Sequence, residues 1–367
     1  MSKGPLAARI ARLIAAEGPI SVAAFVAMAL HDPNDGYYAH AQPIGADGDF
    51  ITAPETSQIF GELIGLWFAR MWEAIGRPDP VVLAELGPGR GSLARDLLRA
   101  AGTVPVFRRA LRLYLIETSP RLRAEQQRRL ADAAPVWLDA IDGLPAGPLL
   151  LVANEFLDAL PIRQFIRGPI GWSERMVALD PAGALVFADM RASPAAALLA
   201  EQARRGSALS DEIVEICPAA LALAASLGDR LVHQPGAALF IDYGYADERR
   251  GMSLRAVRRH RPVPALEHPG AADLSADVDF GAFAQAARSA GAGIRGPVSQ
   301  ARFLTSLGAK VRLAALSAGA SPAERSTLGQ GLERLLDPEG MGGFKVMAMT
   351  SPNLPLPDDL AVLCKSP

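Results

Sequence analysis

Short apolar runs alternate with amphipathic stretches along most of the chain. Each run ends at a glycine or a polar residue, which predicts a buried strand, and the stretches between runs carry apolar residues at helical spacing. Strands that alternate with helices are typical of a parallel sheet covered by helices on its faces. We therefore expect a doubly wound, mostly parallel α/β fold, with strands near residues 81–84, 111–116, 136–138, 149–153, 237–241 and 344–350.

The regions outside this pattern predict further helices and one β-ribbon. Residues 5–30 predict two helices that are broken at Gly18-Pro19, with Ser21 as the N-cap of the second helix. A turn signal at residues 180–183 predicts a ribbon over residues 163–190. Other helices are expected at residues 57–75, 121–131, 195–230, 281–290, 300–316 and 322–336.

The chain has 367 residues, which is longer than a domain built around a single hydrophobic core usually is. We therefore expect insertions or two lobes. We predict an N-terminal helical region that covers a cofactor, two halves of an α/β core, an inserted lobe of ribbon and helices, and a tail. In chain order these are residues 1–76, 77–162, 163–230, 231–350 and 351–367, with a substrate-side excursion at 245–280.

Composition narrows the class of protein. Half of the residues are hydrophobic and 21% are charged, as is usual for soluble globular proteins. The net charge of −2 shows none of the excess positive charge that is typical of nucleic-acid-binding proteins, so we expect no nucleic-acid partner. The arginine cluster at 121–129 is interpreted as a solvated helix face. Cys217, Cys364 and five scattered histidines predict neither a disulfide framework nor a metal site.

The chain shows no membrane or export signal. No apolar run approaches the roughly 18 residues of a transmembrane helix, so none is expected. The helix-like start carries Arg9 and Arg12 but lacks the cleavage site of a signal peptide. We therefore expect a cytoplasmic protein of bacterial type, and the oligomeric state stays open.

Candidate chemistry begins where the first core strand ends. Glu85 is followed by Gly87, Gly89 and Gly91 at alternate positions, and then by a helix-like stretch. Glycines let the backbone take positive φ and let a ligand approach closely. A dinucleotide site of the form G-x-G-x-x-G would need a third glycine where Ser92 stands. The acid-x-G-x-G-x-G spacing instead resembles motif I of class I S-adenosylmethionine methyltransferases, although a glycine turn that binds nothing is the alternative.

Polar residues follow the other predicted strands. Ligands of parallel sheets gather beyond the carboxyl ends of the strands, near the point where the strand order reverses. We expect Glu117 to accept the ribose hydroxyls of the cofactor and Asp139 to reach its adenine amino group. The alternative for Glu117 is an acid that caps the next helix, and for Asp139 a solvated acid.

The stretch NEFLDALP at residues 154–161 is the second candidate. If a helical turn follows the strand, Glu155 and Asp158 share one side. Two carboxylates suit the planar guanidinium of an arginine, which is always charged. A capping acid at a helix start fits the spacing equally well. Asp242 ends another strand on the same edge, and we expect it to line the acceptor pocket. Acids at 273, 277 and 279 form a cluster that either meets a basic substrate or is a solvated loop.

Six ordered stretches make the chain similar to the MidA-type methyltransferases almost end to end. They are ALHDPNDGYY at 29–38, GDFITAPETSQIFGE at 48–62, ELGPGRG at 85–91, NEFLDALP at 154–161, ADLSADVDF at 272–280 and GFKV at 343–346. The resemblance implies a class I methyltransferase fold of Rossmann-like type, with S-adenosyl-L-methionine as cofactor. The resemblance also implies that Gly48, Asp49 and Thr52 contact that cofactor. Mitochondrial members of this family are protein arginine methyltransferases that assist assembly of respiratory complex I.

From the motifs and the resemblance together we predict the site residues. The catalytic residues are predicted to be Glu155, Asp158 and Asp242. The cofactor-binding residues are predicted to be Gly48, Asp49, Thr52, Glu85, Gly87, Pro88, Gly89, Gly91, Glu117, Asp139 and Asn154. The family often carries His where this chain has Asp277, so a proton-handling role of that His does not transfer.

The expected function is methylation of an arginine side chain on a protein partner, with a complex I subunit as the candidate partner. Two alternatives stay open. The excursions at 163–230 and 245–280 are large enough for an assembly factor or chaperone that binds the cofactor but acts mainly by holding a partner. A small-molecule methyltransferase fits the same fold.

Overall fold

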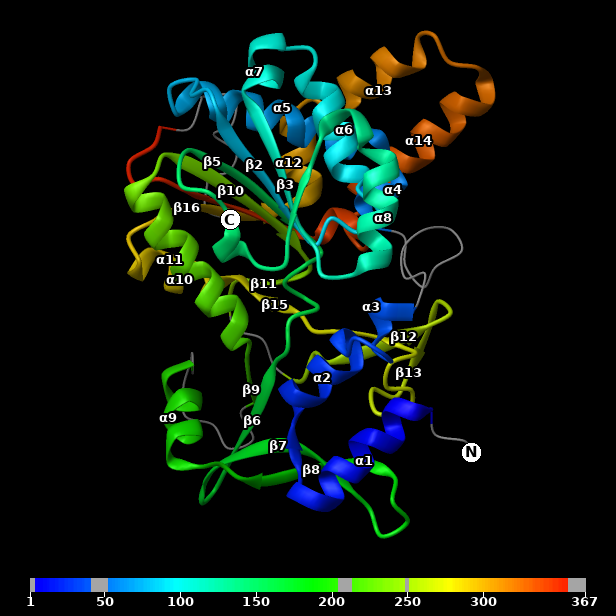
Figure 1. Cartoon of the computed structure of the whole chain (residues 1–367), viewed down its shortest axis with the longest axis vertical. Helices are drawn as coiled ribbons and strands as arrows, with labels where there is room; N and C mark the ends of the chain where they lie inside the picture. The colour runs from blue at the N-terminus through cyan, green and yellow to red at the C-terminus, as the bar shows by residue number, and fades with distance from the viewer. Residues whose placement is uncertain (1–3, 41–51, 204–212, 248–250, 356–367) are drawn as a thin grey trace. The chain divides into compact units, whose positions relative to one another are not determined.

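The computed structural model in Figure 1 describes residues 4–40, 52–203, 213–247 and 251–355. The chain divides into two compact units, each assembled from three segments. The first unit comprises Met1–Phe50, Asp158–Ala222 and Tyr245–Ala282, and the second comprises Ile51–Leu157, Leu223–Gly244 and Phe283–Pro367. The finer division into five segments stays a prediction.

The second unit is built on a seven-stranded sheet with the order β16-β17-β10-β5-β2-β3-β4. Strands β4, β3, β2, β5 and β10 run parallel, and β17 is antiparallel to both β10 and β16. The strands are β2 (Val81–Leu86), β3 (Leu111–Ile116), β4 (Val136–Leu138), β5 (Leu149–Asn154), β10 (Gly236–Asp242), β16 (Gly293–Ser299) and β17 (Lys345–Thr350). The expected doubly wound, mostly parallel α/β fold is thus confirmed.

The register of the parallel strands aligns their carboxyl ends along one edge. Leu86 pairs with Ile116 and Ala153, Ile116 also pairs with Leu138, and Asn154 pairs with Ile241. The strand order reverses between β2 and β5, because the chain moves outward through β3 and β4 before it returns on the other side of β2. Open α/β sheets bind ligands at such a switch point.

The central strands β2, β5 and β10 are buried along their whole length, as in parallel sheets that carry helices on both faces. Helix α5 buries Phe60, Trp67 and Phe68 in the same apolar core as Leu83 and Leu150. The helices are α4 (Ala53–Thr56), α5 (Gln58–Ala74), α6 (Ser92–Ala101), α7 (Pro105–Ala110), α8 (Pro120–Arg129), α12 (Gln300–Ser306), α13 (Ala309–Ser317) and α14 (Pro322–Leu336). Helices α10 (Pro218–His233) and α11 (Phe280–Ser289) start in the first unit and continue into the second.

The first unit combines short helices with two antiparallel sheets, and β11 and β15 form a separate two-stranded sheet. In the larger sheet the order is β1-β7-β6-β9, with β8 also paired to β7, and in the smaller one it is β13-β12-β14. The helices are α1 (Pro5–Glu17), α2 (Val22–His31), α3 (Tyr37–His40) and α9 (Pro194–Ala203). The strands are β1 (Ile20–Ser21), β6 (Arg163–Gly168), β7 (Gly171–Leu179), β8 (Leu185–Arg191), β9 (Ile213–Ile216), β11 (Gly244–Tyr245), β12 (Arg255–Arg258), β13 (Arg261–Val263), β14 (Asp273–Ser275) and β15 (Val278–Asp279). Ser21 caps α2 as predicted, since its hydroxyl accepts from the Ala24 N–H at 3.1 Å.

Two sequence-based expectations about helices are wrong in part, and one core strand was not expected. The helical stretch expected over 195–230 contains strand β9, whose β-branched residues pair with β6. The helix expected over 300–316 is two helices, because Gly308 takes a φ of +87° and starts α13. Strand β16 was not expected, since Gly296 and Pro297 interrupt its apolar pattern. Both residues are tolerated because β16 is an edge strand of the sheet.

Candidate functional site

The glycine turn after β2 lies at the switch point of the sheet. Gly87, Gly89 and Gly91 have φ values of +59°, +51° and +80°, a backbone region that L side chains rarely adopt. Gly91 is the left-handed N-cap of α6. A Cβ added at Gly87 would lie 2.8 Å from Cδ2 of Phe156, so the turn packs directly against the chain that leaves β5. The turn therefore presents bare backbone at the edge where ligands bind.

Glu117 follows β3 on the same edge and is 9% exposed. Its Oε1 accepts from the Ser119 N–H at 2.8 Å, and its Oε2 accepts from Nε2 of Gln126 at 3.3 Å. Burial raises the pKa of Glu117, while these hydrogen bonds and one from Thr118 oppose the rise. The N-cap of α8 is Ser119, whose hydroxyl accepts from the Leu122 N–H, so Glu117 contacts the capping residue and does not cap the helix itself. Binding of a ribose by the Glu117 carboxylate stays a prediction.

Arg123 on α8 joins the ends of β3 and β4. Its Nε donates to the Glu117 carbonyl at 2.6 Å, and its guanidinium pairs with Oδ1 of Asp139 at 2.6 Å. The Asp139 side chain is 85% exposed, so its carboxylate stays accessible beside this pair. The predicted contact of Asp139 with adenine is untested. The solvated-face interpretation of the 121–129 cluster is wrong for Arg123, because this side chain organises the strand ends.

Asn154 and Glu155 lie where β5 ends, directly across the switch point from the glycine turn. Glu155 has a φ of +48°, which is unusual for a residue with a side chain. Its Oε1 accepts from the Ala53 N–H and from Nδ2 of Asn154, each at 3.1 Å. Glu155 therefore anchors the start of α4 at the site edge, with Thr52 as the N-cap of that short helix.

Asp242 at the end of β10 is 1% exposed. Its Oδ2 accepts from the backbone N–H groups of Phe156 and Leu157, at 3.2 and 3.0 Å. Its Oδ1 accepts from the Tyr243 N–H at 3.0 Å. A buried carboxylate with these contacts positions the loop after β5, and the predicted catalytic role of Asp242 stays a prediction.

The helical turn that would bring Glu155 and Asp158 to one side is not formed. Residues 155–160 leave β5 as bends and turns, because Glu155 takes its left-handed angle at the first step. Asp158 belongs to the first unit, where its carbonyl accepts from the Ala276 N–H at 3.0 Å. The nearby Asp277 pairs with Arg255 at 2.5 Å. Gly48 and Asp49 lie outside the described residues.

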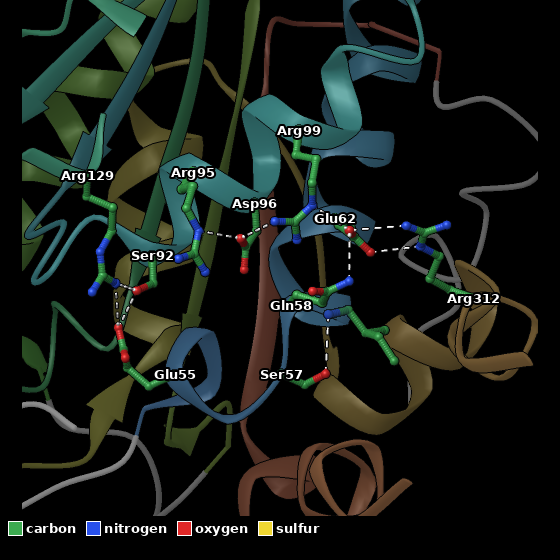
Figure 2. A network of polar contacts seen from close by, with 11 residues as sticks. Glu55, Ser57, Gln58, Glu62, Ser92, Arg95, Asp96, Arg99, Arg129 and Arg312 are labelled. Atoms are coloured by element: carbon green, nitrogen blue, oxygen red, sulfur yellow. Dashed lines mark hydrogen bonds and ion pairs between the residues drawn. The ribbon is translucent and has the colours of Figure 1, made fainter. Parts of the chain in front are cut away.

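A polar network fixes α4 against the glycine turn. The Ser92 hydroxyl, which stands where a dinucleotide motif would have glycine, bonds to both Glu55 and Arg129 (Figure 2). Arg90 within the turn donates to Glu125 of α8 at 2.6 Å. Sequence reasoning missed these residues, although an arginine inside a glycine turn, at position 90, is a signal that the turn contacts an acid. Elements that are distant in sequence are thus held together around the turn.

Glu85 lies under the turn, at the penultimate position of β2, and is 4% exposed. Burial raises the pKa of Glu85 to about 8, although a hydrogen bond from the Ala94 N–H opposes the rise. Its Oε2 has no hydrogen-bond partner among the described residues. Glu85 is therefore protonated over much of the range near neutral pH, and its predicted contact with the cofactor is untested.

Among the described residues, no helix is long and apolar enough to cross a membrane. The described part of the chain also contains no group of three or more His, Cys, Asp or Glu side chains that could hold a metal ion. The candidate site is thus an edge of glycines, acids and amides within the second unit.

Comparisons with known proteins agree with this geometry. Residues 63–298 match the profile of the family described as "Putative S-adenosyl-L-methionine-dependent methyltransferase". The mitochondrial protein arginine methyltransferase NDUFAF7 of Mus musculus is 37% identical over 92% of this chain and 82% of its own length. The corresponding protein of Homo sapiens is 35% identical over 92% of this chain and 81% of its own.

Solved structures give the same relationship. A protein of Burkholderia thailandensis bound to S-adenosyl-homocysteine superposes with a TM-score of 0.84 at 31% identity, and the match covers 98% of this chain and 97% of that one. A second structure from the same organism has a TM-score of 0.80 at 33% identity, with 95% and 94% of the two chains covered.

Proposed function

Since this chain belongs to the family of S-adenosyl-L-methionine-dependent methyltransferases, we propose that it methylates an arginine side chain on a protein partner. The observation that carries the proposal is the extent of the similarity, 37% identity over 92% of this chain, to a relative named as a protein arginine methyltransferase. The site agrees with it, because the carboxylate of Glu155 lies at the switch point beside the glycine turn.

The residues at the sheet edge fit S-adenosylmethionine. Gly87 and Gly91 hold left-handed backbone angles, and their N–H groups donate to the Ile116 and Pro88 carbonyls at 3.1 and 2.7 Å. Gly89 between them carries no side chain, so a ligand can approach its backbone closely. The Oδ1 atom of Asn154 is buried and has no hydrogen-bond partner among the described residues, so it offers an acceptor to a ligand. When bound, the cofactor supplies an electrophilic methyl group on a sulfonium.

The chain's own side chains would bind and orient the reactants. Glu117 would accept the ribose hydroxyls, and Glu155 would orient the guanidinium of the acceptor and balance its charge. Asp242 holds the loop after β5 through two backbone N–H groups, so the acceptor edge is fixed before binding. Positioning of this kind can lower a barrier by roughly 7–11 kcal/mol.

A glutamine at position 155 provides the sharpest test of this role. Glu155→Gln keeps an oxygen that can accept from the Ala53 N–H but removes the charge. We expect S-adenosylhomocysteine affinity within twofold of the unaltered protein and methyl transfer to an arginine peptide reduced roughly 10²-fold, as for loss of one electrostatic contact in other enzymes. Glu17→Gln on the exposed side of α1 is the control. Full activity of Glu155→Gln would refute the role of the carboxylate.

The partner is part of the same proposal. We propose a protein acceptor, with a respiratory complex I subunit as the first candidate and the cytoplasm of a bacterium as the setting. Mass spectrometry of the quinone-side core subunit, with and without the gene for this chain, should show methylated arginine only when the gene is present. An unchanged arginine mass would reject this acceptor without rejecting methyltransferase activity.

A further inference from the structure

The buried side chain of Gln126 on α8 contacts residues at or after the ends of three neighbouring strands. The side chain is 0% exposed. Its Nε2 donates to the Gly89 carbonyl at 2.7 Å and to Oε2 of Glu117 at 3.3 Å, and its Oε1 accepts from Nε1 of Trp137 at 2.8 Å. One amide thus touches the glycine turn after β2, the acid after β3 and strand β4.

Trp137 fixes which way this amide points. An indole N–H can only donate, so the amide oxygen must face Trp137. The NH₂ group must then face the Gly89 carbonyl and the Glu117 carboxylate, both of which can accept. The described geometry therefore leaves one orientation in which all three partners are satisfied, and buried polar groups rarely stay unsatisfied.

The two groups that Gln126 joins are both predicted to bind the cofactor. The glycine turn offers backbone to the cofactor, and Glu117 is the predicted ribose acceptor. The amide also packs beneath the turn, since a Cβ at Gly91 would lie 3.4 Å from Cγ of Gln126. The Gln126 side chain thus links the turn directly to the Glu117 carboxylate, in addition to the backbone pairing of β2 with β3.

We propose that Gln126 is a positioning residue for S-adenosylmethionine, held in one amide orientation by Trp137, that fixes the glycine turn and the Glu117 carboxylate at the spacing the cofactor requires. The inference rests on the cofactor of the proposed function and not on the methyl acceptor. Gln126 donates a hydrogen bond to Oε2 of Glu117, which favours the ionised carboxylate that accepts hydroxyl groups.

Replacement by a glutamate separates positioning from packing. Gln126→Glu keeps the shape but donates only while its carboxyl is protonated. As the pH rises, a buried negative charge then faces the Gly89 carbonyl and Glu117, whereas the amide of the unaltered protein does not titrate. Gln127→Glu is the matched control, because it makes the same change at the next position, which is exposed.

Calorimetric affinity for S-adenosylhomocysteine, measured between pH 6 and pH 9, is the readout. The ratio of Kd for Gln126→Glu to Kd for the unaltered protein is expected to rise at least tenfold over this range, while the ratio for Gln127→Glu stays within twofold. A ratio for Gln126→Glu that is the same at all pH values would overturn the proposal.

If Gln126→Glu does not fold, Trp137→Phe takes its place, since phenylalanine fills part of the indole volume but lacks the N–H that orients the amide. Its Kd is expected to rise three- to tenfold, and an unchanged Kd would overturn the proposal. Failure of the unaltered protein to bind S-adenosylhomocysteine would reject the proposed function as well, so the two results are distinguishable.

Discussion

Gly87 meets two constraints at one position. Its φ of +59° lies in the left-handed region, and an added Cβ would lie 2.8 Å from the Phe156 ring. A left-handed angle costs a residue with a side chain about 1–2 kcal/mol. The Phe156 ring would have to move to make room for the added Cβ, and it belongs to the residue that follows Glu155.

Gly87→Ala is expected to weaken S-adenosylhomocysteine binding by about tenfold or more, since about 1.4 kcal/mol corresponds to a factor of ten. Titration calorimetry measures this loss. Gly183→Ala is the control, because Gly183 has a φ of +76° with no atom near its Cβ position and belongs to the first unit. It carries the same strain but should leave the affinity unchanged. Equal losses in both variants would show that strain alone, not the shape of the turn, is responsible.

Glu85 makes stability depend on pH. Its folded-state pKa of about 8 exceeds the value of 4.5 expected for an exposed glutamate, so the folded protein binds the proton more tightly than the unfolded chain does. Stability is therefore highest below pH 4.5 with respect to this group and falls as the pH rises toward 8. The slope in this window is about 1.4 kcal/mol per pH unit at most.

Glu85→Gln should remove this slope, because the glutamine keeps an acceptor for the Ala94 N–H and has no charge to bury. Urea denaturation at pH 6 and pH 8.5 is expected to show the variant gaining stability relative to the unaltered protein at the higher pH. Glu17→Gln at an exposed position should follow the unaltered protein. Parallel curves for Glu85→Gln and the unaltered protein would contradict the assigned burial effect.

At the scale of elements, a buried carboxylate joins three helices. Glu62 of α5 is 4% exposed and pairs with Arg99 of α6 and Arg312 of α13, at 2.9 and 2.7 Å (Figure 2). Burial raises the pKa of Glu62, but hydrogen bonds from the two arginines outweigh it and leave the pKa lowered. Helix α13 is thus attached to the core by a charge pair at its inner face.

Glu62→Gln is expected to lower the free energy of unfolding by about 1–3 kcal/mol. Removal of one partner of a buried ion pair usually lowers the stability by more than this. Here both arginines are about 40% exposed, so water can solvate their charges when the carboxylate is removed. Chemical denaturation measures the change. Glu73→Gln on the same helix is the matched control, since its pairs with Arg70 and Arg77 are at the surface and should contribute less than about 0.5 kcal/mol. A similar loss for both variants would be inconsistent with this account.

At the scale of the whole molecule, the described cofactor edge lies within one of two units. Gly87, Glu117, Asn154 and Asp242 all belong to the second unit, although Asp242 comes from a segment that residues 158–222 of the first unit separate from the other three. Binding energy at this edge should therefore stabilise the second unit first.

S-adenosylhomocysteine at a hundredfold excess over its Kd should stabilise the folded protein by about 2.7 kcal/mol, through mass action. Thermal melting with and without the ligand measures the shift. Hydrogen exchange should show new protection at residues 86–92, 117–126 and 152–157 and little in β7 and β8. Protection that is spread evenly over both units would contradict the assignment of the site to the second unit.

Most of the core strands could be predicted from sequence because a buried parallel strand is a local apolar run. Strands β3 and β4 begin and end at the predicted residues, and the acids that follow them lie on one edge as expected. Strands β9 and β16 were missed, since β9 has only four residues, β16 contains Gly296 and Pro297, and both pair with strands that are distant in sequence. The local pattern of apolar and polar residues contains no information about such partners.

The sequence by itself determined the alternation of strands and helices, the glycine turn and its family, because each depends on residues that are close along the chain. The tertiary structure decided what individual side chains do. It turned Asp242 toward backbone N–H groups, gave Glu155 a left-handed angle where a helical turn was considered, and placed Gln126 between the turn and Glu117. These roles depend on atoms far apart in sequence that hydrogen-bond only once the sheet has aligned the ends of its strands.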